Sequence, residues 1–210
     1  MFERLLGRFG PQGWWPGETP FEVMIGAILT QNTNWTNVEK AIANLQREAD
    51  FSPHGLLALP PGRLAELIRP SGYFNQKAAK LRDFLEFYLR STGGEKRRMR
   101  RRPLAALRRD LLAVRGIGPE TADSILLYAL GKPVFVVDAY TRRVLSRHGA
   151  CRPDASYDEL QRLFMDHLPP DAALFNEFHA LLVRVGKEHC RKSVPRCEGC
   201  PLEGLEFPSP

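Results

Sequence analysis

The sequence predicts an all-α protein. Apolar residues recur at helical spacing through most of the chain, and no run of alternating apolar and polar residues is typical of a strand. Hydrophobic residues make up 43% of the 210 residues, enough to bury a core as one domain or as two closely joined lobes. Glycines and prolines separate the apolar segments, at Pro60-Pro61, Pro70-Ser71-Gly72, Gly93-Gly94 and Pro169-Pro170. We detect no internal repeat.

The first strong helix has a recognisable start. Thr19 is placed to cap this helix and Pro20 to occupy its first position, so we expect a helix over Phe21 to Leu29. The other segments with helical spacing of apolar residues are 37–46, 61–68, 76–91, 104–114, 119–130, 139–148, 157–167 and 171–190.

The charge of the chain favours a polyanionic partner. Lysine and arginine outnumber aspartate and glutamate by 30 to 24, which gives a formal charge of +6 and a pI near 9.3. Part of this charge forms one run before a glycine hairpin, made of Lys96, Arg97, Arg98, Arg100, Arg101, Arg102, Arg108 and Arg109. Two interpretations of the run stay open, a solvated face and a contact with a nucleic-acid backbone.

The lack of a recognisable targeting signal and the pattern of the cysteines lead us to expect a cytoplasmic protein. No long apolar run follows Met1, and no stretch of about 18 apolar residues predicts a membrane span, so we expect no membrane partner. Cys151 stands alone, whereas Cys190, Cys197 and Cys200 cluster near the end of the chain. This pattern favours metal ligation in a reducing compartment over a disulfide framework.

The segment Leu111 to His148 carries the strongest functional signal. Gly116-Ile117-Gly118 precedes a predicted helix, and two glycines at this spacing let backbone amides converge on one phosphate. Asp138 follows the apolar residues Phe135-Val136-Val137, where its carboxylate is expected to be poorly solvated. A plain glycine turn and a helix-capping aspartate are the alternative interpretations.

Hairpin, spacing and aspartate together resemble the helix-hairpin-helix and Gly/Pro-Asp motif of DNA glycosylases of the endonuclease III superfamily. The resemblance implies two helical lobes with a DNA-binding cleft between them, residues 20–133 forming one lobe and 1–19 with 134–210 the other. It implies that Arg115, Gly116, Gly118 and Thr121 contact DNA. The expected partner is double-stranded DNA with a damaged base, bound by a monomer in the nucleoid.

In the resembling family the aspartate of the motif is catalytic, and here this residue is Asp138. A fixed carboxylate stabilises the positive charge that builds on the sugar when an N-glycosidic bond breaks, and it can take a proton from water. Family members that also cleave the strand carry a lysine two residues after the second hairpin glycine. Glu120 occupies this position, and a carboxylate cannot form a Schiff base. Glu120 is interpreted as a residue of the substrate pocket or as a first-turn residue that complements the helix dipole.

Residues 14 to 148 resemble a narrower branch, the 3-methyladenine DNA glycosylases built on the same fold. The resemblance rests on Trp14-Trp15-Pro16 and on the segments 27–33 and 69–78. It implies that Gln31 fills the gap left by the flipped nucleotide and that Tyr73 wedges the opposite strand. An indole face attracts a positively charged alkylated purine, so we expect Trp14 or Trp15 to stack on the extruded base, with core packing as the alternative.

The C-terminal loop, residues 185–207, reads Cys190-x6-Cys197-x2-Cys200. This spacing matches the first three ligands of the endonuclease III iron–sulfur loop, and Glu206 stands where the fourth cysteine belongs. A [4Fe–4S] cluster usually takes four thiolates, so Glu206, His189 or an external thiol would have to complete it. Zinc and a metal-free loop are the alternatives.

We therefore expect a monofunctional DNA N-glycosylase of base-excision repair that flips and excises alkylated purines of the 3-methyladenine type. The alternatives are a bifunctional glycosylase and abasic-site lyase acting on oxidised pyrimidines, and a non-catalytic protein that binds DNA structure.

Overall fold

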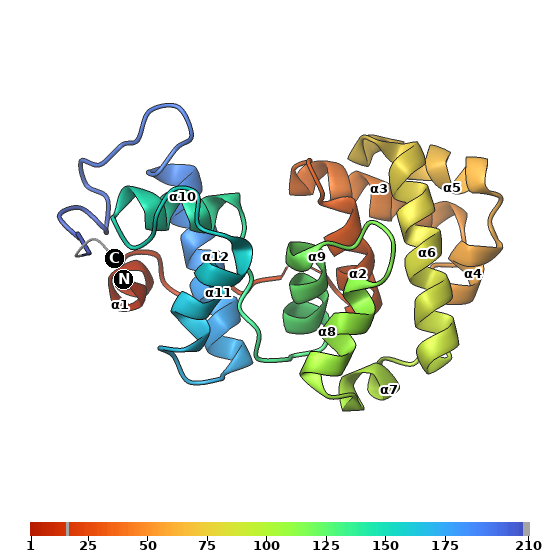
Figure 1. Cartoon of the computed structure of the whole chain (residues 1–210). Helices are drawn as coiled ribbons and strands as arrows, with labels where there is room; N and C mark the ends of the chain where they lie inside the picture. Colours follow the sequence, from red (N-terminus) through yellow and green to blue (C-terminus); the bar gives the residue numbers. More distant parts are fainter. Residues whose placement is uncertain (16, 208–210) are drawn as a thin grey trace. The chain divides into compact units, whose positions relative to one another are not determined.

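A computed structural model describes residues 1–15 and 17–207 (Figure 1). Within these residues every regular element is helical, which confirms the predicted fold class. The chain divides into two compact units. We call Pro16–Lys132 the central unit, and Met1–Trp15 together with Pro133–Pro210 the terminal unit.

The helices of the central unit are α2 (Pro20–Leu29), α3 (Trp35–Glu48), α4 (Pro53–Ala58), α5 (Pro61–Leu67), η1 (Arg69–Ser71), α6 (Phe74–Thr92), α7 (Lys96–Arg101), α8 (Leu104–Leu112), α9 (Pro119–Ser124) and η2 (Ile125–Ala129). Helix α2 packs against η2 and against α3, α6 and α9 (Figure 1). Its residues from Glu22 to Leu29 are buried. Its expected start is confirmed, because the Thr19 side chain accepts a hydrogen bond from Glu22 N at 3.1 Å.

Two parts of the central unit differ from the sequence-based expectation. The helix expected over 119–130 is α-helical only to Ser124 and continues as a π-helical turn, η2. The basic run forms the short helix α7 with its C-cap Arg102, and its last two residues, Arg108 and Arg109, lie in the second half of α8. Four of its side chains form ion pairs, namely Arg98 with Glu95, Arg102 and Arg109 with Asp110, and Arg108 with Asp123. The other four, Lys96, Arg97, Arg100 and Arg101, are exposed.

The helices of the terminal unit are α1 (Phe2–Phe9), α10 (Ala139–Arg147), α11 (Tyr157–Met165) and α12 (Ala172–Glu188). Helix α12 packs against both α1 and α10. A Cβ at Gly186 would lie 2.6 Å from the Tyr140 ring, so the missing side chain allows α10 to approach α12 closely.

An aromatic cluster forms the core of this unit beside Asp138. Phe135 stacks on Phe164 with ring centroids 3.6 Å apart and meets Phe175 and Phe178 edge-on. No helix among the described residues is long and apolar enough to cross a membrane.

Candidate functional site

The glycine hairpin lies between α8 and α9. Val114 and Ile117 are buried, and Ile117 N donates to Val114 O at 3.1 Å, so two apolar side chains hold the turn on the central unit. Gly116 has a φ of +83° and Gly118 is extended, and both are exposed. A Cβ at Gly118 would meet nothing within 4 Å, so the backbone there is open to a ligand. The arrangement is a helix-hairpin-helix.

A buried ion pair joins the two helices of this motif. The guanidinium of Arg108 donates two hydrogen bonds to the Asp123 carboxylate, at 2.8 and 3.0 Å, and Asp123 is fully buried. Paired donors on a planar guanidinium restrict orientation as well as distance. Arg108 therefore stabilises the packing of the two helices. This role differs from both interpretations of the basic run, a solvated face and a contact with a nucleic-acid backbone.

Gln31 lies against the hairpin. Its Nε2 donates to Gly116 O at 3.1 Å and to the Thr121 hydroxyl at 3.0 Å, and its Oε1 accepts from Lys80 Nζ at 2.5 Å. The structure thus brings together three of the residues predicted to contact DNA, Gln31, Gly116 and Thr121.

Lys77 connects this region to the loop that carries Tyr73. Its buried Nζ donates to Leu29 O, at the end of α2, and to Ser71 O, at 2.8 and 2.6 Å. Burial, followed by the charge of Lys80, lowers the pKa of Lys77 to about 8. The sequence did not single out Lys77, because it lies on a helix and its two acceptors belong to other elements.

Tyr73 and Arg115 project from the central unit. Tyr73 is 65% exposed and has a φ of +46°, unusual for a residue with a side chain. Arg115 is exposed and pairs with Asp83 at 2.8 Å. Glu120 is exposed in the first turn of α9, where a carboxylate complements the helix dipole.

Asp138 lies in the terminal unit and begins α10. Its Oδ1 accepts a hydrogen bond from Thr141 N at 2.7 Å, so the aspartate caps this helix. Its Oδ2 lies 3.6 Å from Nε2 of His179, a buried residue of α12, and 15% of the Asp138 side chain is exposed. Capping occupies one oxygen and leaves the other in a poorly solvated site beside an imidazole.

The charge of Asp138 is favoured by its partners. Burial alone would raise the pKa of the Asp138 carboxyl, but the charge and hydrogen bonding of His179 and the Thr141 hydrogen bond outweigh burial, so this pKa lies below its ordinary value. His179 was missed by sequence reasoning, because a single histidine on an apolar helix has no local signal of function.

Trp14 and Trp15 lie in the same unit. Both are half-buried, and their rings meet edge-on with centroids 5.6 Å apart. The side-chain amide of Asn176 donates to Trp14 O at 2.7 Å, which ties the tryptophan segment to α12, the helix that carries His179. Pro16, the third residue of the predicted motif, lies outside the described residues.

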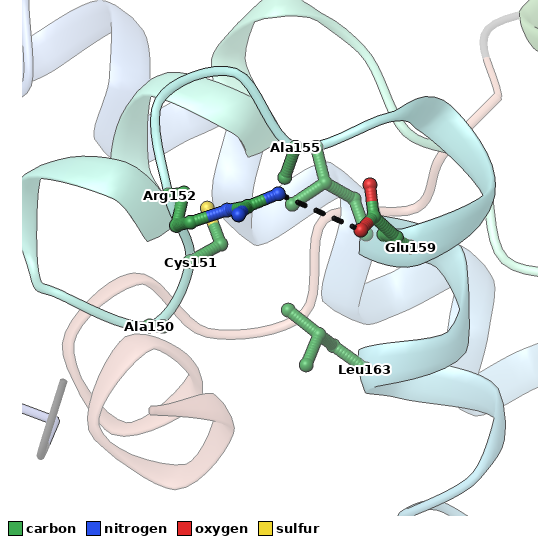
Figure 2. Close-up of a pocket in the computed structure, with 7 residues that line it drawn as sticks. Ala150, Cys151, Arg152, Ala155, Glu159 and Leu163 are labelled. Carbon is green, nitrogen blue, oxygen red and sulfur yellow. Dashed lines mark ion pairs between the residues drawn. The ribbon is translucent and has the colours of Figure 1, made fainter. Parts of the chain in front are cut away.

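A hollow of about 360 Å³ occupies another part of the terminal unit (Figure 2). Its lining includes Cys151, Leu163, Arg152 and Glu159. The last two form an ion pair, with 3.9 Å between Arg152 Nη2 and Glu159 Oε1. None of the predicted site residues is among those that line this hollow. Cys151, which stands apart from the other cysteines in the sequence, is buried.

The predicted metal ligands do not form a complete site. Cys190 is buried, Cys200 is half-buried, and Cys197 and Glu206 are exposed. Burial is the main cause that raises the pKa of the Cys200 thiol, and the nearby Cys197 and Cys190 add to it. Across residues 1–15 and 17–207, however, no group of three or more histidine, cysteine, aspartate or glutamate side chains is arranged to hold a metal ion. The iron–sulfur loop is therefore not confirmed beyond its sequence pattern.

Protein contacts hold the start of this C-terminal loop. Arg143 donates to Cys190 O at 2.6 Å and to Gly186 O at 3.0 Å. Arg147 donates to Arg191 O at 2.6 Å, and its guanidinium lies 3.5 Å from the Cys190 sulfur. The start of the loop is thus attached to α10 through backbone carbonyls.

Sequence comparisons agree with this geometry. The family model described as HhH-GPD superfamily base excision DNA repair protein matches residues 25–170. A Methanocaldococcus jannaschii protein, named as a candidate DNA repair glycosylase, is 45% identical over 97% of this chain and 92% of its own length. Endonuclease III of Thermotoga maritima is 30% identical over 88% of this chain and 81% of its own length.

Solved structures show the same relationship. A trapped endonuclease III–DNA covalent intermediate has a TM-score of 0.83 at 26% identity, covering 97% of this chain and 91% of that one. The Helicobacter pylori 3-methyladenine DNA glycosylase bound to 1,N6-ethenoadenine has a TM-score of 0.73 at 32% identity, covering 89% of this chain and 97% of that one. With its helix-hairpin-helix and the aspartate that follows it, the chain belongs to the HhH-GPD superfamily of base excision DNA repair proteins, within the endonuclease III superfamily, and is a DNA glycosylase.

Proposed function

We propose that this glycosylase is monofunctional and excises alkylated purines, 3-methyladenine first. The observation that carries the proposal is Glu120, an exposed carboxylate at the hairpin position where lyase members of the family have a lysine. Nearby amines are engaged elsewhere, since Lys77 is buried with two carbonyl acceptors and Lys80 donates to Gln31. Without a Schiff base at this position, water is the nucleophile.

Asp138 is proposed as the catalytic carboxylate. As the base leaves with the bonding electrons, the sugar becomes cationic, and a preorganised negative charge stabilises it. The lowered pKa of Asp138 keeps it ionised at neutral pH but makes it a weaker base. The charge-stabilising role is therefore the larger one, and removal of a proton from the attacking water is secondary. His179, at 3.6 Å, is proposed to orient the carboxylate.

The central unit is proposed to hold the damaged duplex. Phosphates are bound by the open backbone at Gly118 and by the adjoining Gly116, Thr121 and Arg115. Because phosphates carry no sequence information, this binding does not depend on the base sequence. Tyr73 is proposed to wedge the duplex, since it is an exposed ring on a turn held by the Lys77 hydrogen bond to Ser71 O. Gln31 is proposed to release its hydrogen bonds with the hairpin and to fill the gap that the flipped nucleotide leaves in the duplex. The protein is proposed to act as a monomer in the nucleoid.

Preference for alkylated purines is supported by the tryptophans and by the relatives. Trp14 and Trp15 offer indole surfaces, which attract a base made cationic by alkylation. The structure of a 3-methyladenine DNA glycosylase, 32% identical over 89% of this chain, supports the same preference. No step of the proposed reaction uses a metal or cluster.

An endonuclease III-like glycosylase and lyase is the second candidate. It is favoured by the 30% identity to endonuclease III of Thermotoga maritima and by the fold shared with an endonuclease III–DNA covalent intermediate. Its chemistry requires an amine nucleophile, which Glu120 does not supply.

A panel of duplexes with methylated purines or oxidised pyrimidines separates the two candidates. Release of free base is measured by chromatography, strand nicking by gel electrophoresis, and covalent trapping by borohydride. We expect release of 3-methyladenine, without nicking or a trapped adduct. A borohydride-trapped adduct, or release of oxidised pyrimidines alone, would instead support the lyase.

A further inference from the structure

Asn176 has an unpaired acceptor in a buried position. Its Oδ1 is inaccessible to solvent and has no hydrogen-bond partner among the described residues. Its Nδ2 donates to Trp14 O at 2.7 Å. Rotating the amide by 180° would place oxygen against oxygen, so this bond fixes the direction of Oδ1. Buried acceptors in native proteins nearly always have a donor, and an exception requires an explanation.

The position of Asn176 links the tryptophan segment to the catalytic carboxylate. Asn176 lies three residues before His179 on α12, a spacing that places two side chains on the same face of a helix. His179 Nε2 in turn lies 3.6 Å from Asp138 Oδ2. These residues all belong to the terminal unit. The unpaired acceptor therefore lies near the carboxylate that acts on the sugar and beside the residues proposed to stack on its base.

The chemistry of the missing partner follows from the atoms left unpaired. Oδ1 requires an N–H donor, and the Trp14 indole Nε1, also buried without a hydrogen-bond partner among the described residues, requires an acceptor. Adenine presents an exocyclic amine at C6 beside the ring acceptors N1 and N7. Guanine and hypoxanthine present an oxygen at C6, which would face Oδ1 as acceptor against acceptor.

We propose that Asn176 selects the base, its Oδ1 accepting a hydrogen bond from the C6 amine of an extruded adenine-type lesion. This inference rests on the proposed function, because it needs an alkylated purine as substrate. Asn176 is thus a specificity residue, distinct in role from the carboxylate that acts on the sugar.

The test uses duplex DNA treated with a methylating agent, which contains 3-methyladenine and 3-methylguanine in one sample. The two released bases are separated by chromatography, and their initial rates give an internal ratio. We expect Asn176→Leu, which has similar size and no polar atom, to release 3-methyladenine about ten- to a hundredfold more slowly. Release of 3-methylguanine should not slow, because its C6 oxygen faces Oδ1 as a second acceptor and gains nothing from it.

Asn44→Leu is the matched control. The Asn44 amide also donates to a backbone carbonyl, Leu67 O at 3.0 Å, but in the central unit. Asn44→Leu should leave the ratio of the two release rates unchanged. A second measurement needs no variant, namely inhibition of the wild-type protein by free 3-methyladenine and free 3-methylhypoxanthine, which carry an amine and an oxygen at C6, respectively. We expect free 3-methyladenine, which carries the amine, to bind about tenfold more tightly than 3-methylhypoxanthine.

The possible results separate this inference from the proposed function. Equal slowing of both bases by Asn176→Leu, an unchanged ratio, or equal inhibition by the two free bases overturns the role of Asn176 and leaves the proposed function standing. A wild-type protein that releases neither methylated base overturns the proposed function and this inference with it.

Discussion

Asp138→Asn separates catalysis from helix capping. Asparagine caps helices about as well as aspartate, so the Thr141 hydrogen bond and the start of α10 should persist. The negative charge is lost, and removing one preorganised electrostatic group costs about two to three orders of magnitude in rate. We expect this decrease in base release under single-turnover conditions, with DNA affinity retained in fluorescence anisotropy.

The effect of Asp138→Asn on stability follows from the contact with His179. At 3.6 Å and an effective dielectric constant of about 20, a carboxylate attracts a full positive charge by about 4–5 kcal/mol, which is the upper bound for its contact with His179. Desolvation of two buried groups offsets most of this attraction, so the net loss should be about 1–2 kcal/mol. In a chain of this length such a loss lowers Tm by roughly 2–8 °C.

The pH dependence gives a second signature of Asp138. Because its folded pKa lies below the unfolded value, the carboxylate stabilises the fold at neutral pH, and this contribution is lost as the pH falls through the folded pKa. The difference in unfolding free energy between wild type and Asp138→Asn should therefore disappear in acid.

Asp171→Asn is the control, since Asp171 caps α12 in the same unit. It should release base at the wild-type rate. An Asp138→Asn protein within about threefold of the wild-type rate would refute the electrostatic role.

Three further predictions concern the hairpin, the buried lysine and the C-terminal loop. Gly118→Val should fold normally but bind all duplexes more weakly, with a salt slope about one unit shallower; unchanged binding by anisotropy would show that the hairpin is only a turn. Because the unfolded chain holds the Lys77 proton more tightly, the unfolding free energy of wild type relative to Lys77→Met should rise between pH 8 and 10.5. A flat difference in urea titrations would contradict the lowered pKa. Anaerobically purified protein should lose iron to a chelator faster than Glu206→Cys, whose fourth thiolate completes the set; neither iron nor sulfide in either protein would exclude a cluster.

Elements with a cap and an apolar stripe were predictable from the sequence. Thr19 and Pro20 identified the start of α2, and the observed helix begins at Pro20. Helix α7 was not predicted, because it is six residues long and Met99 is its buried residue, so it has no apolar stripe. The π-helical turn η2 was also missed, since its side-chain pattern does not differ from that of an α-helix over so few residues.

The candidate site was predictable where a local motif carries it. Gly116, Gly118 and Asp138 stand at fixed spacing, and local sequence is enough to recognise them. His179, Asn176 and Lys77 each contact at least one residue that is 41 to 162 positions away in the chain. Such partners depend on how helices pack, and a single sequence has no record of this packing.

The division of the chain into a continuous unit and a discontinuous one has a consequence for synthesis on the ribosome. Residues 16–132 form the central unit, which can complete its core as soon as Lys132 has emerged. The first 15 residues, with Trp14 and Trp15, must wait for α12, whose Asn176 binds the Trp14 carbonyl. An incomplete chain could therefore hold DNA through its hairpin before the groups that break the glycosidic bond are assembled. Nascent chains stalled once Lys132 has emerged from the ribosome, but before α12 has emerged, should bind duplex DNA without releasing any base.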